Sequence, residues 1–227
     1  MKSAHNYTIR LLASAAVSLA MLSGASAAAE ATAPAAAQGA SVTQAPDAFI
    51  KVITADVFAT VKSDKALQSG DIHKVTQVVD TKIMPNVNFP RMTAAAVGPA
   101  WRQATADQKA RLQEEFKTLL VRTYSGALAQ VSDQTISIKP LRAAADDTDV
   151  VVRSEVRGKG DPIQLDYRLE KTPGVGAGWK IYNLNVMGVW LVETYRSQFA
   201  KEINAKGIDG LIATLTERNK ANNAKKG

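Results

Sequence analysis

Apolar residues change their spacing twice along this chain, and that order restricts the fold more than any other feature. Up to residue 128 they recur every three or four residues, as on one face of a helix. From residue 136 to 181 they alternate with polar residues, as in strands that have one buried face. The helical spacing returns after Gly188. Helices, a sheet and further helices in this order predict an α+β fold, with the helices gathered over a single sheet.

Six helices are predicted from the spacing and from the residues that begin or end a helix. Thr105 opens the longest one, and Gln108 three residues later completes a capping box. Gly207 ends the fifth helix, because glycine is favoured just after a helix C-terminus. The predicted helices begin near Pro46, Asp71, Met92, Thr105, Gly188 and Asp209.

The predicted sheet has four antiparallel strands. They cover residues 136–138, 150–156, 163–169 and 179–181, and short turns rich in Asp, Gly or Pro join them. Such short turns require neighbouring strands to be antiparallel. In the last strand Ile181 and the out-of-phase Leu184 and Val186 are all apolar. Either a bulge shifts the phase of this strand or both of its faces are covered.

The first 27 residues have the form of a secretory signal peptide. Lys2 and Arg10 give a positive start, residues 11–22 are apolar and uncharged, and Ala25-Ser26-Ala27 is an A-x-A cleavage site. The apolar stretch is shorter than the roughly 20 residues of a membrane-spanning helix. We therefore expect an exported protein. Its predicted parts are the signal peptide (residues 1–27), an Ala-rich flexible linker (28–45), a folded domain (46–219) and a basic disordered tail (220–227).

The residue types that the chain lacks exclude whole classes of site. It has 227 residues with no cysteine and only two histidines, His5 and His73. Disulfides, thiolate metal sites and cysteine nucleophiles are therefore excluded, and so is a multi-histidine metal site, because His5 lies in the predicted signal peptide. The formal net charge of +7 comes from scattered basic residues without interleaved aromatic residues. This pattern favours an anionic membrane surface or an acidic protein face over a nucleic acid as partner.

No arrangement in the sequence points to catalysis. The loop from Gly174 to Gly178 leads into a strand, whereas a phosphate-binding loop leads into a helix N-terminus. The acidic turn at residues 146–149 lacks the central Gly and the closing Glu of a calcium loop. His73 lies in the polar first turn of a helix, where we expect it to be solvated. We predict neither an enzyme nor a metal site, since an enzyme on this fold would need His73 or an Asp such as Asp166 to point into the interior.

Several stretches of the chain, taken in order, resemble the MlaC family of periplasmic phospholipid-binding proteins, also known as toluene-tolerance proteins. The longest runs from Trp179 to Phe199 and reads WKIYNLNVMGVWLVETYRSQF. The others are residues 83–102, 105–128, 166–168 and 207–215, so the resemblance covers nearly all of residues 46–219. Four positions depart from the family pattern: Asn88 and Asn183 stand where Asp is usual, Trp190 where Ser is common, and Val131 where Tyr is frequent.

The resemblance implies a fold like that of nuclear transport factors, with a sheet wrapped by helices around an apolar cavity. It also implies a carrier that shuttles phospholipids through the periplasm between an outer-membrane lipoprotein–porin complex and an inner-membrane ABC transporter complex. Such a carrier maintains outer-membrane lipid asymmetry, and it holds the phospholipid as carried ligand without any cofactor. Two other functions stay open: an enzyme acting on a small apolar substrate, and a ligand-free scaffold or binding module with a filled core.

The predicted lining of this cavity consists of apolar side chains that face inward between the sheet and the helices. Arg91 or Arg168 is predicted to contact the headgroup phosphate near the cavity mouth. The predicted lining residues are Phe89, Met92, Phe116, Leu120, Tyr124, Val152, Leu165, Tyr167, Leu169, Ile181, Val189 and Val192.

Overall fold

The computed structural model describes residues 44–129, 131, 133–144, 146–158 and 160–224 of the chain. All of them lie within one compact unit of the chain, residues 39–227. The predicted signal peptide and the predicted linker up to residue 43 lie outside the described residues. Gln44, which was assigned to the flexible linker, is instead held by two hydrogen bonds. Its N–H donates to the Ala177 carbonyl at 3.1 Å, and its own carbonyl accepts from the Trp179 indole at 2.9 Å.

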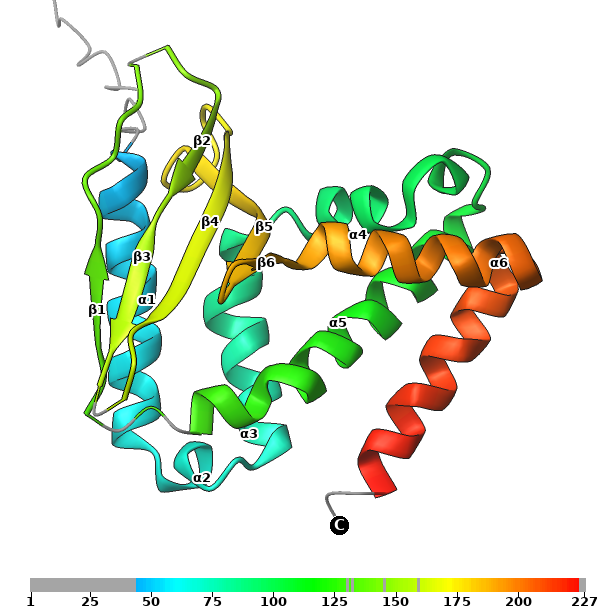
Figure 1. Ribbon diagram of the computed structural model, residues 1–227, viewed down its shortest axis with the longest axis horizontal. Helices are drawn as coiled ribbons and strands as arrows, with labels where there is room; N and C mark the ends of the chain where they lie inside the picture. Colours follow the sequence, from blue (N-terminus) through cyan, green and yellow to red (C-terminus); the bar gives the residue numbers. More distant parts are fainter. Residues whose placement is uncertain (1–43, 130, 132, 145, 159, 225–227) are drawn as a thin grey trace, which may run out of the picture. The chain divides into compact units, whose positions relative to one another are not determined.

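Helices, strands and further helices follow one another as predicted, which confirms the α+β class (Figure 1). The α-helices are α1 (Pro46–Ser63), α2 (Lys65–Gln68), α3 (Ile72–Val78), α4 (Phe89–Val97), α5 (Ala106–Ala129) and α6 (Leu191–Ala224). Short π- and 3₁₀-helices connect some of them: η1 (Val79–Ile83), η2 (Met84–Asn86) and η3 (Gly98–Arg102). The strands are β1 (Thr135–Ile138), β2 (Asp149–Val152), β3 (Ser154–Arg157), β4 (Ile163–Lys171), β5 (Trp179–Val186) and β6 (Val189–Trp190).

Side chains cap the helices that position the interior. The predicted capping box before α5 is confirmed: the Thr105 N–H donates to Gln108 Oε1 at 3.0 Å, and the Gln108 N–H donates to Thr105 Oγ1 at 3.2 Å. Asn88 caps α4 by accepting the Arg91 N–H at 3.0 Å. This cap starts α4 at Phe89, earlier than the apolar spacing indicated.

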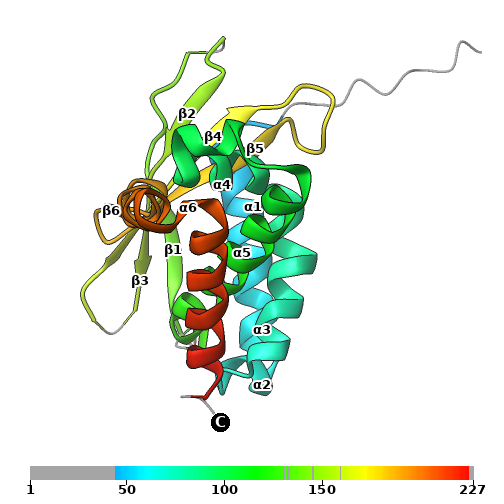
Figure 2. The same cartoon turned by 90° about the vertical axis from the view of Figure 1, so that its right-hand side faces the viewer.

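Helix α6 is bent at Gly207, whose φ of 71° and ψ of −174° are not helical, so the predicted helix end at this residue is confirmed. Its second half turns back alongside α5 (Figures 1 and 2). Thr216 and Asn219 there donate hydrogen bonds to the Glu115 carboxylate of α5, at 2.7 and 2.6 Å. The helix continues to Ala224, so the first five residues of the tail predicted as disordered, 220–224, are helical instead.

The sheet has six strands, not the predicted four, and its pairs are antiparallel as predicted. The predicted strand 150–156 is two strands, β2 and β3, interrupted at Arg153. Directly after the break, the Ser154 N–H donates to the Asp166 carboxylate at 3.2 Å, and the Ser154 hydroxyl donates to the Leu165 carbonyl. The sixth strand, β6, is a two-residue segment that returns beside the end of β5.

A bulge in β5 resolves the mixed apolar pattern of that strand. Arg168 pairs with Asn183 and Leu169 with Ile181, which leaves Tyr182 as the extra residue. The phase shift brings Ile181 and Leu184 onto one face of the sheet. This apolar face carries Leu165, Tyr167 and Leu169 of β4 with their β5 partners, and the opposite, polar face carries Asp166, Arg168 and Glu170 with theirs.

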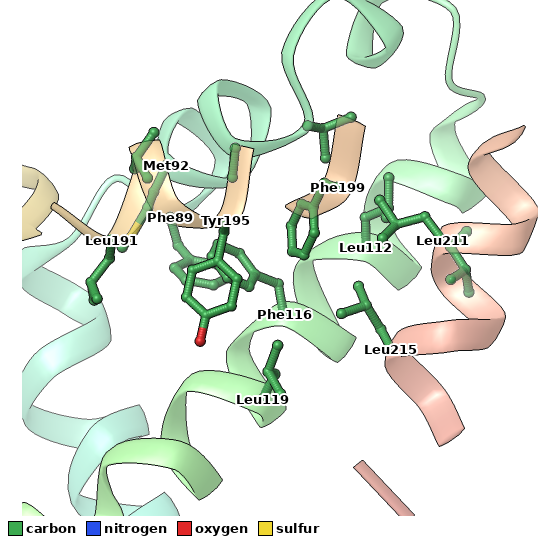
Figure 3. Packing of buried hydrophobic residues seen from close by; sticks show 14 residues of the cluster. Phe89, Met92, Leu112, Phe116, Leu119, Leu191, Tyr195, Phe199, Leu211 and Leu215 are labelled. Atoms are coloured by element: carbon green, nitrogen blue, oxygen red, sulfur yellow. The ribbon is translucent and has the colours of Figure 1, made fainter. Parts of the chain in front are cut away.

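Three groups of buried side chains form the core of the described residues, and two of them lie over the apolar face and beside it. The helix cluster is formed by α4, α5 and α6 around Phe116, and Figure 3 shows its packing. The sheet cluster joins Phe49 and Ile50 of α1 to the apolar face of β2, β4 and β5. Val87 and Leu184 pack against both clusters, so the two clusters meet at these side chains.

Candidate functional site

The predicted lining residues are divided between the two clusters. The helix cluster contains Phe89, Met92, Phe116 and Val192, with Leu120 and Tyr124 packed at its edge. The sheet cluster contains Val152, Tyr167, Leu169 and Ile181, with Leu165 packed at its edge. Val189 belongs to neither cluster and is exposed, because it follows the turn after β5 and lies at the end of the sheet. Contact of the other eleven side chains with a ligand stays a prediction.

Aromatic rings form the centre of the helix cluster (Figure 3). The Phe116 ring lies 4.9 Å from that of Tyr195 and 5.2 Å from that of Phe199, both nearly perpendicular to it, and 5.7 Å from that of Phe89. Tyr195 and Phe199 were not among the predicted lining residues. Their helical spacing along α6 showed that they were buried, but it did not show that they face Phe116 of α5.

Tyr167 places a hydroxyl group inside the sheet cluster without a partner. The side chain is buried on the apolar face, and its hydroxyl forms no hydrogen bond within the part of the chain that the structure describes. Burial raises the pKa of this phenol well above its ordinary value. A buried hydroxyl without a partner costs about 1–3 kcal/mol, so a polar atom that reached this group would stabilise it by accepting its hydrogen bond.

Arg91, one of the two predicted headgroup residues, lies on the polar face of the sheet. Its guanidinium forms ion pairs with Glu170 and, at 3.3 Å, with Asp149, and it stacks 3.6 Å from the centre of the Tyr182 ring. The Tyr182 hydroxyl donates to the Asp149 carboxylate at 2.7 Å. Burial and this hydrogen bond raise the pKa of Tyr182 to about 12. Neither Tyr182 nor Glu170 was predicted as a site residue: the bulge changes the strand phase at Tyr182, and the contact between Glu170 and Arg91 joins segments that are far apart in the sequence.

Arg168, the other predicted headgroup residue, is also on the polar face and is also ion-paired. It contacts Glu193 of α6 at 2.6 Å and stacks 4.3 Å from the centre of the Trp190 ring. The second Glu193 oxygen accepts from Asn183 at 2.8 Å. Burial acts to raise the pKa of Glu193, but the hydrogen bonds from Asn183, from its own backbone and from Arg168 lower it below the ordinary value.

The structure therefore brings the two arginines to the side of the sheet opposite to the sheet cluster. Each has a carboxylate and an aromatic ring as neighbours, and their contact with a headgroup phosphate stays a prediction. Asn183 and Trp190, which lie beside this pair of Arg168 and Glu193, are two of the positions that depart from the family pattern. Here the Asn183 amide donates to Glu193, and Trp190 supplies the ring on which Arg168 stacks.

His73 and Asp166, the two side chains singled out for an enzyme on this fold, lie on different elements, α3 and β4. His73 is exposed on α3. Asp166 is buried on the polar face, where its carboxylate accepts the Ser154 N–H at 3.2 Å and the Gln164 amide at 2.6 Å. Within the described ranges, no three His, Asp or Glu side chains are grouped so that they could hold a metal ion.

Two further observations concern a hollow beside the sheet and the length and hydropathy of the helices. A hollow of about 530 Å³ lies along β2 between charged side chains that include Lys139, Arg142 and Arg153, and Val150 of the sheet cluster also lines it. None of the helices that the structure describes is both long enough and apolar enough to cross a bilayer.

Comparison with known proteins gives consistent matches over this domain. A model of the MlaC protein family matches residues 51–217. The toluene tolerance protein ttg2D of Pseudomonas putida is 26% identical over 168 residues, which cover 73% of this chain and 76% of that protein. The intermembrane phospholipid transport system binding protein MlaC of Haemophilus influenzae is 23% identical over 163 residues, which cover 71% of this chain and 76% of that protein.

A solved structure extends the comparison to three dimensions. The phospholipid-binding protein of Ralstonia solanacearum, solved in complex with a phospholipid, is 51% identical to this chain. The two folds superpose with a TM-score of 0.74, over 78% of this chain and 97% of that one.

Proposed function

The chain belongs to the MlaC protein family, and from this premise we propose that it binds a phospholipid and carries it with the acyl chains enclosed between the sheet and the helices. The observation that carries the proposal is the 51% identity to a protein solved with a phospholipid bound. The apolar face of the sheet and the helix cluster supply the two walls that such a ligand requires.

Enclosure of the acyl chains follows from their hydration cost. Each exposed methylene costs about 0.8 kcal/mol in water, so two acyl chains represent on the order of 20 kcal/mol. A carrier must therefore cover nearly all of both chains during transit. The helix cluster and the sheet cluster meet at Val87 and Leu184, and in the proposed role they separate there to open an apolar space.

In the proposed role the protein moves phospholipids through the periplasm, between an outer-membrane lipoprotein–porin complex and an inner-membrane ABC transporter complex. Transfer from a bilayer to an apolar interior exchanges one hydrocarbon environment for another, so its net free energy is close to zero. This balance suits a carrier, because tight binding would prevent release. Direction must then come from the partners and not from this chain.

The experiment that tests the proposal identifies what the protein holds when purified. The full chain is expressed with its own N-terminus, purified without detergent, extracted with organic solvent and analysed by mass spectrometry. We expect phospholipid in stoichiometric amount. A folded, monodisperse protein without lipid would contradict the proposal and favour the ligand-free scaffold or the enzyme.

A further inference from the structure

Three exposed apolar side chains gather at one end of the sheet. Ile163 at the start of β4 is 43% exposed, Met187 after β5 is 71% exposed, and Val189 of β6 is 52% exposed. The Met187 N–H donates to the carbonyl of Gln164, next to Ile163, at 2.9 Å, and Val189 pairs with Val186. We call these three residues the apolar rim. Among the described residues only Val52 and Val175 are comparably large, apolar and exposed, and both lie on other elements.

The backbone conformation at Met187 is energetically unfavourable for a methionine. Val186 and Val189 are paired, so Met187 and Gly188 form a two-residue hairpin turn, and their φ angles are +53° and +86°. Turns with two positive φ angles favour Asn-Gly, whereas methionine rarely adopts a positive φ. Met187 is the one non-glycine residue with a positive φ in the part of the chain described. An exposed apolar side chain in an unfavourable conformation indicates a role outside the folded core.

The apolar rim continues into the interior. Leu165 follows Ile163 by two residues in β4 and pairs with Val186. Both side chains are half-buried on the apolar face. Leu165 packs against the sheet cluster and Val186 against the helix cluster. The rim therefore lies where the boundary between the two clusters reaches the surface.

We propose that the apolar rim inserts into the surface of a phospholipid bilayer, and that lipid enters and leaves the interior across it. This inference rests on the proposed function, since it assigns the route by which the carried ligand reaches its place. Three side chains form a smaller patch than the roughly 1,000 Å² that a stable protein interface buries, but they suffice for shallow insertion among lipids. The net charge is positive even without Lys2 and Arg10 of the predicted signal peptide, which adds attraction to an anionic bilayer surface.

The test measures partition onto vesicles of phosphatidylglycerol and phosphatidylcholine by co-sedimentation. Val189→Thr is compared with Val175→Thr, which has the same exposure of 52% but lies in the turn at the opposite end of the β4–β5 hairpin. We expect Val189→Thr combined with Met187→Asn to reduce the partition coefficient about tenfold or more, and Val175→Thr to change it less than twofold. Met187→Asn is expected to raise the melting temperature, because asparagine suits the turn, so weaker binding could not be ascribed to unfolding.

Three results would overturn the proposal: no vesicle binding by the unchanged protein, equal loss in the Val175→Thr control, or unchanged binding in the double variant. The phospholipid content of each protein is measured in parallel. If the unchanged protein holds stoichiometric lipid but does not bind vesicles, the insertion of the apolar rim is refuted and the proposed function stands. Absence of lipid from the unchanged protein would refute the proposed function itself.

Discussion

Two tyrosines of the sheet differ in what their hydroxyl groups contact, and this gives a matched pair of substitutions. The Tyr167 hydroxyl is buried and has no hydrogen-bond partner among the described residues, whereas the Tyr182 hydroxyl donates to Asp149 at 2.7 Å. We expect Tyr167→Phe to leave the free energy of unfolding of the lipid-free protein unchanged or to raise it by about 1 kcal/mol, because it removes an unsatisfied polar group. Tyr182→Phe should lower it by about 1 kcal/mol. Urea denaturation measures both, and destabilisation by Tyr167→Phe would show that its hydroxyl has a partner.

A second prediction for a single residue concerns the Glu193 carboxylate and the pH dependence of stability. Its hydrogen bonds to Asn183 and Arg168 lower its pKa in the folded protein. A lowered pKa stabilises the folded state above the unfolded pKa of about 4.3, and this contribution is lost as the pH falls through the folded pKa. Glu193→Gln should therefore reduce stability at pH 7, by at most about 1 kcal/mol because the ion pair is half-exposed. The difference from the unchanged protein should shrink as the pH falls below 4.

The urea midpoints of the two proteins at pH 7 and pH 3.5 measure this effect. Glu217→Gln is the control, because Glu217 pairs with the exposed Lys220 in the last turns of α6 and, among the described residues, with no other cation. A difference between Glu193→Gln and the unchanged protein that is the same at both pH values would show that Glu193 acts through packing and not through its charge.

At the scale of the element, the bend of α6 depends on one backbone conformation. Gly207 has φ 71° and ψ −174°, a region that only glycine occupies without strain, and no atom lies within 4 Å of the place where a Cβ would stand. Gly207→Ala should therefore cost about 1–3 kcal/mol through the backbone alone. Gly126→Ala in α5 is the matched control, with equal free space and no positive φ, and should stabilise by up to about 1 kcal/mol. Similar effects of the two substitutions in thermal unfolding would contradict this account of the bend.

The elements also show how far the sequence determines the site. The apolar period identified Leu165, Tyr167 and Leu169 as one buried face, because strand periodicity depends only on local residues. It could not show that Tyr182 is a bulge, since a bulge is defined by the register of the partner strand. The same period places Arg168 on the opposite face, but it could not show that Arg91 of α4 reaches that face through its ion pairs with Glu170 and Asp149. Contacts between distant segments, such as Phe116 with Phe199, have no local signal.

At the scale of the whole molecule, the apolar interior has to be considered both with and without a bound phospholipid. In the structure the helix cluster and the sheet cluster touch at Val87 and Leu184, whereas the proposed function places a phospholipid between them. Removal of lipid leaves either an empty cavity, at about 24 cal/mol for each Å³, or a collapsed interior that has lost its contacts with the acyl chains. Both outcomes lower the stability of the lipid-free protein relative to the loaded one.

Thermal unfolding of loaded and delipidated protein tests this directly. A ligand at 100 times its Kd stabilises by about 2.7 kcal/mol, which for a domain of this size corresponds to a shift of roughly 5–10 °C. We expect the delipidated protein to melt lower by about that amount and to recover when phospholipid vesicles are added. In the variant that combines Val189→Thr and Met187→Asn, lipid should raise the melting temperature by the same final amount. The rise should be slower, because the apolar rim affects the entry of lipid and not its contacts once enclosed. Equal melting temperatures with and without lipid would mean that the acyl chains are not enclosed, and the interior would then be an ordinary core.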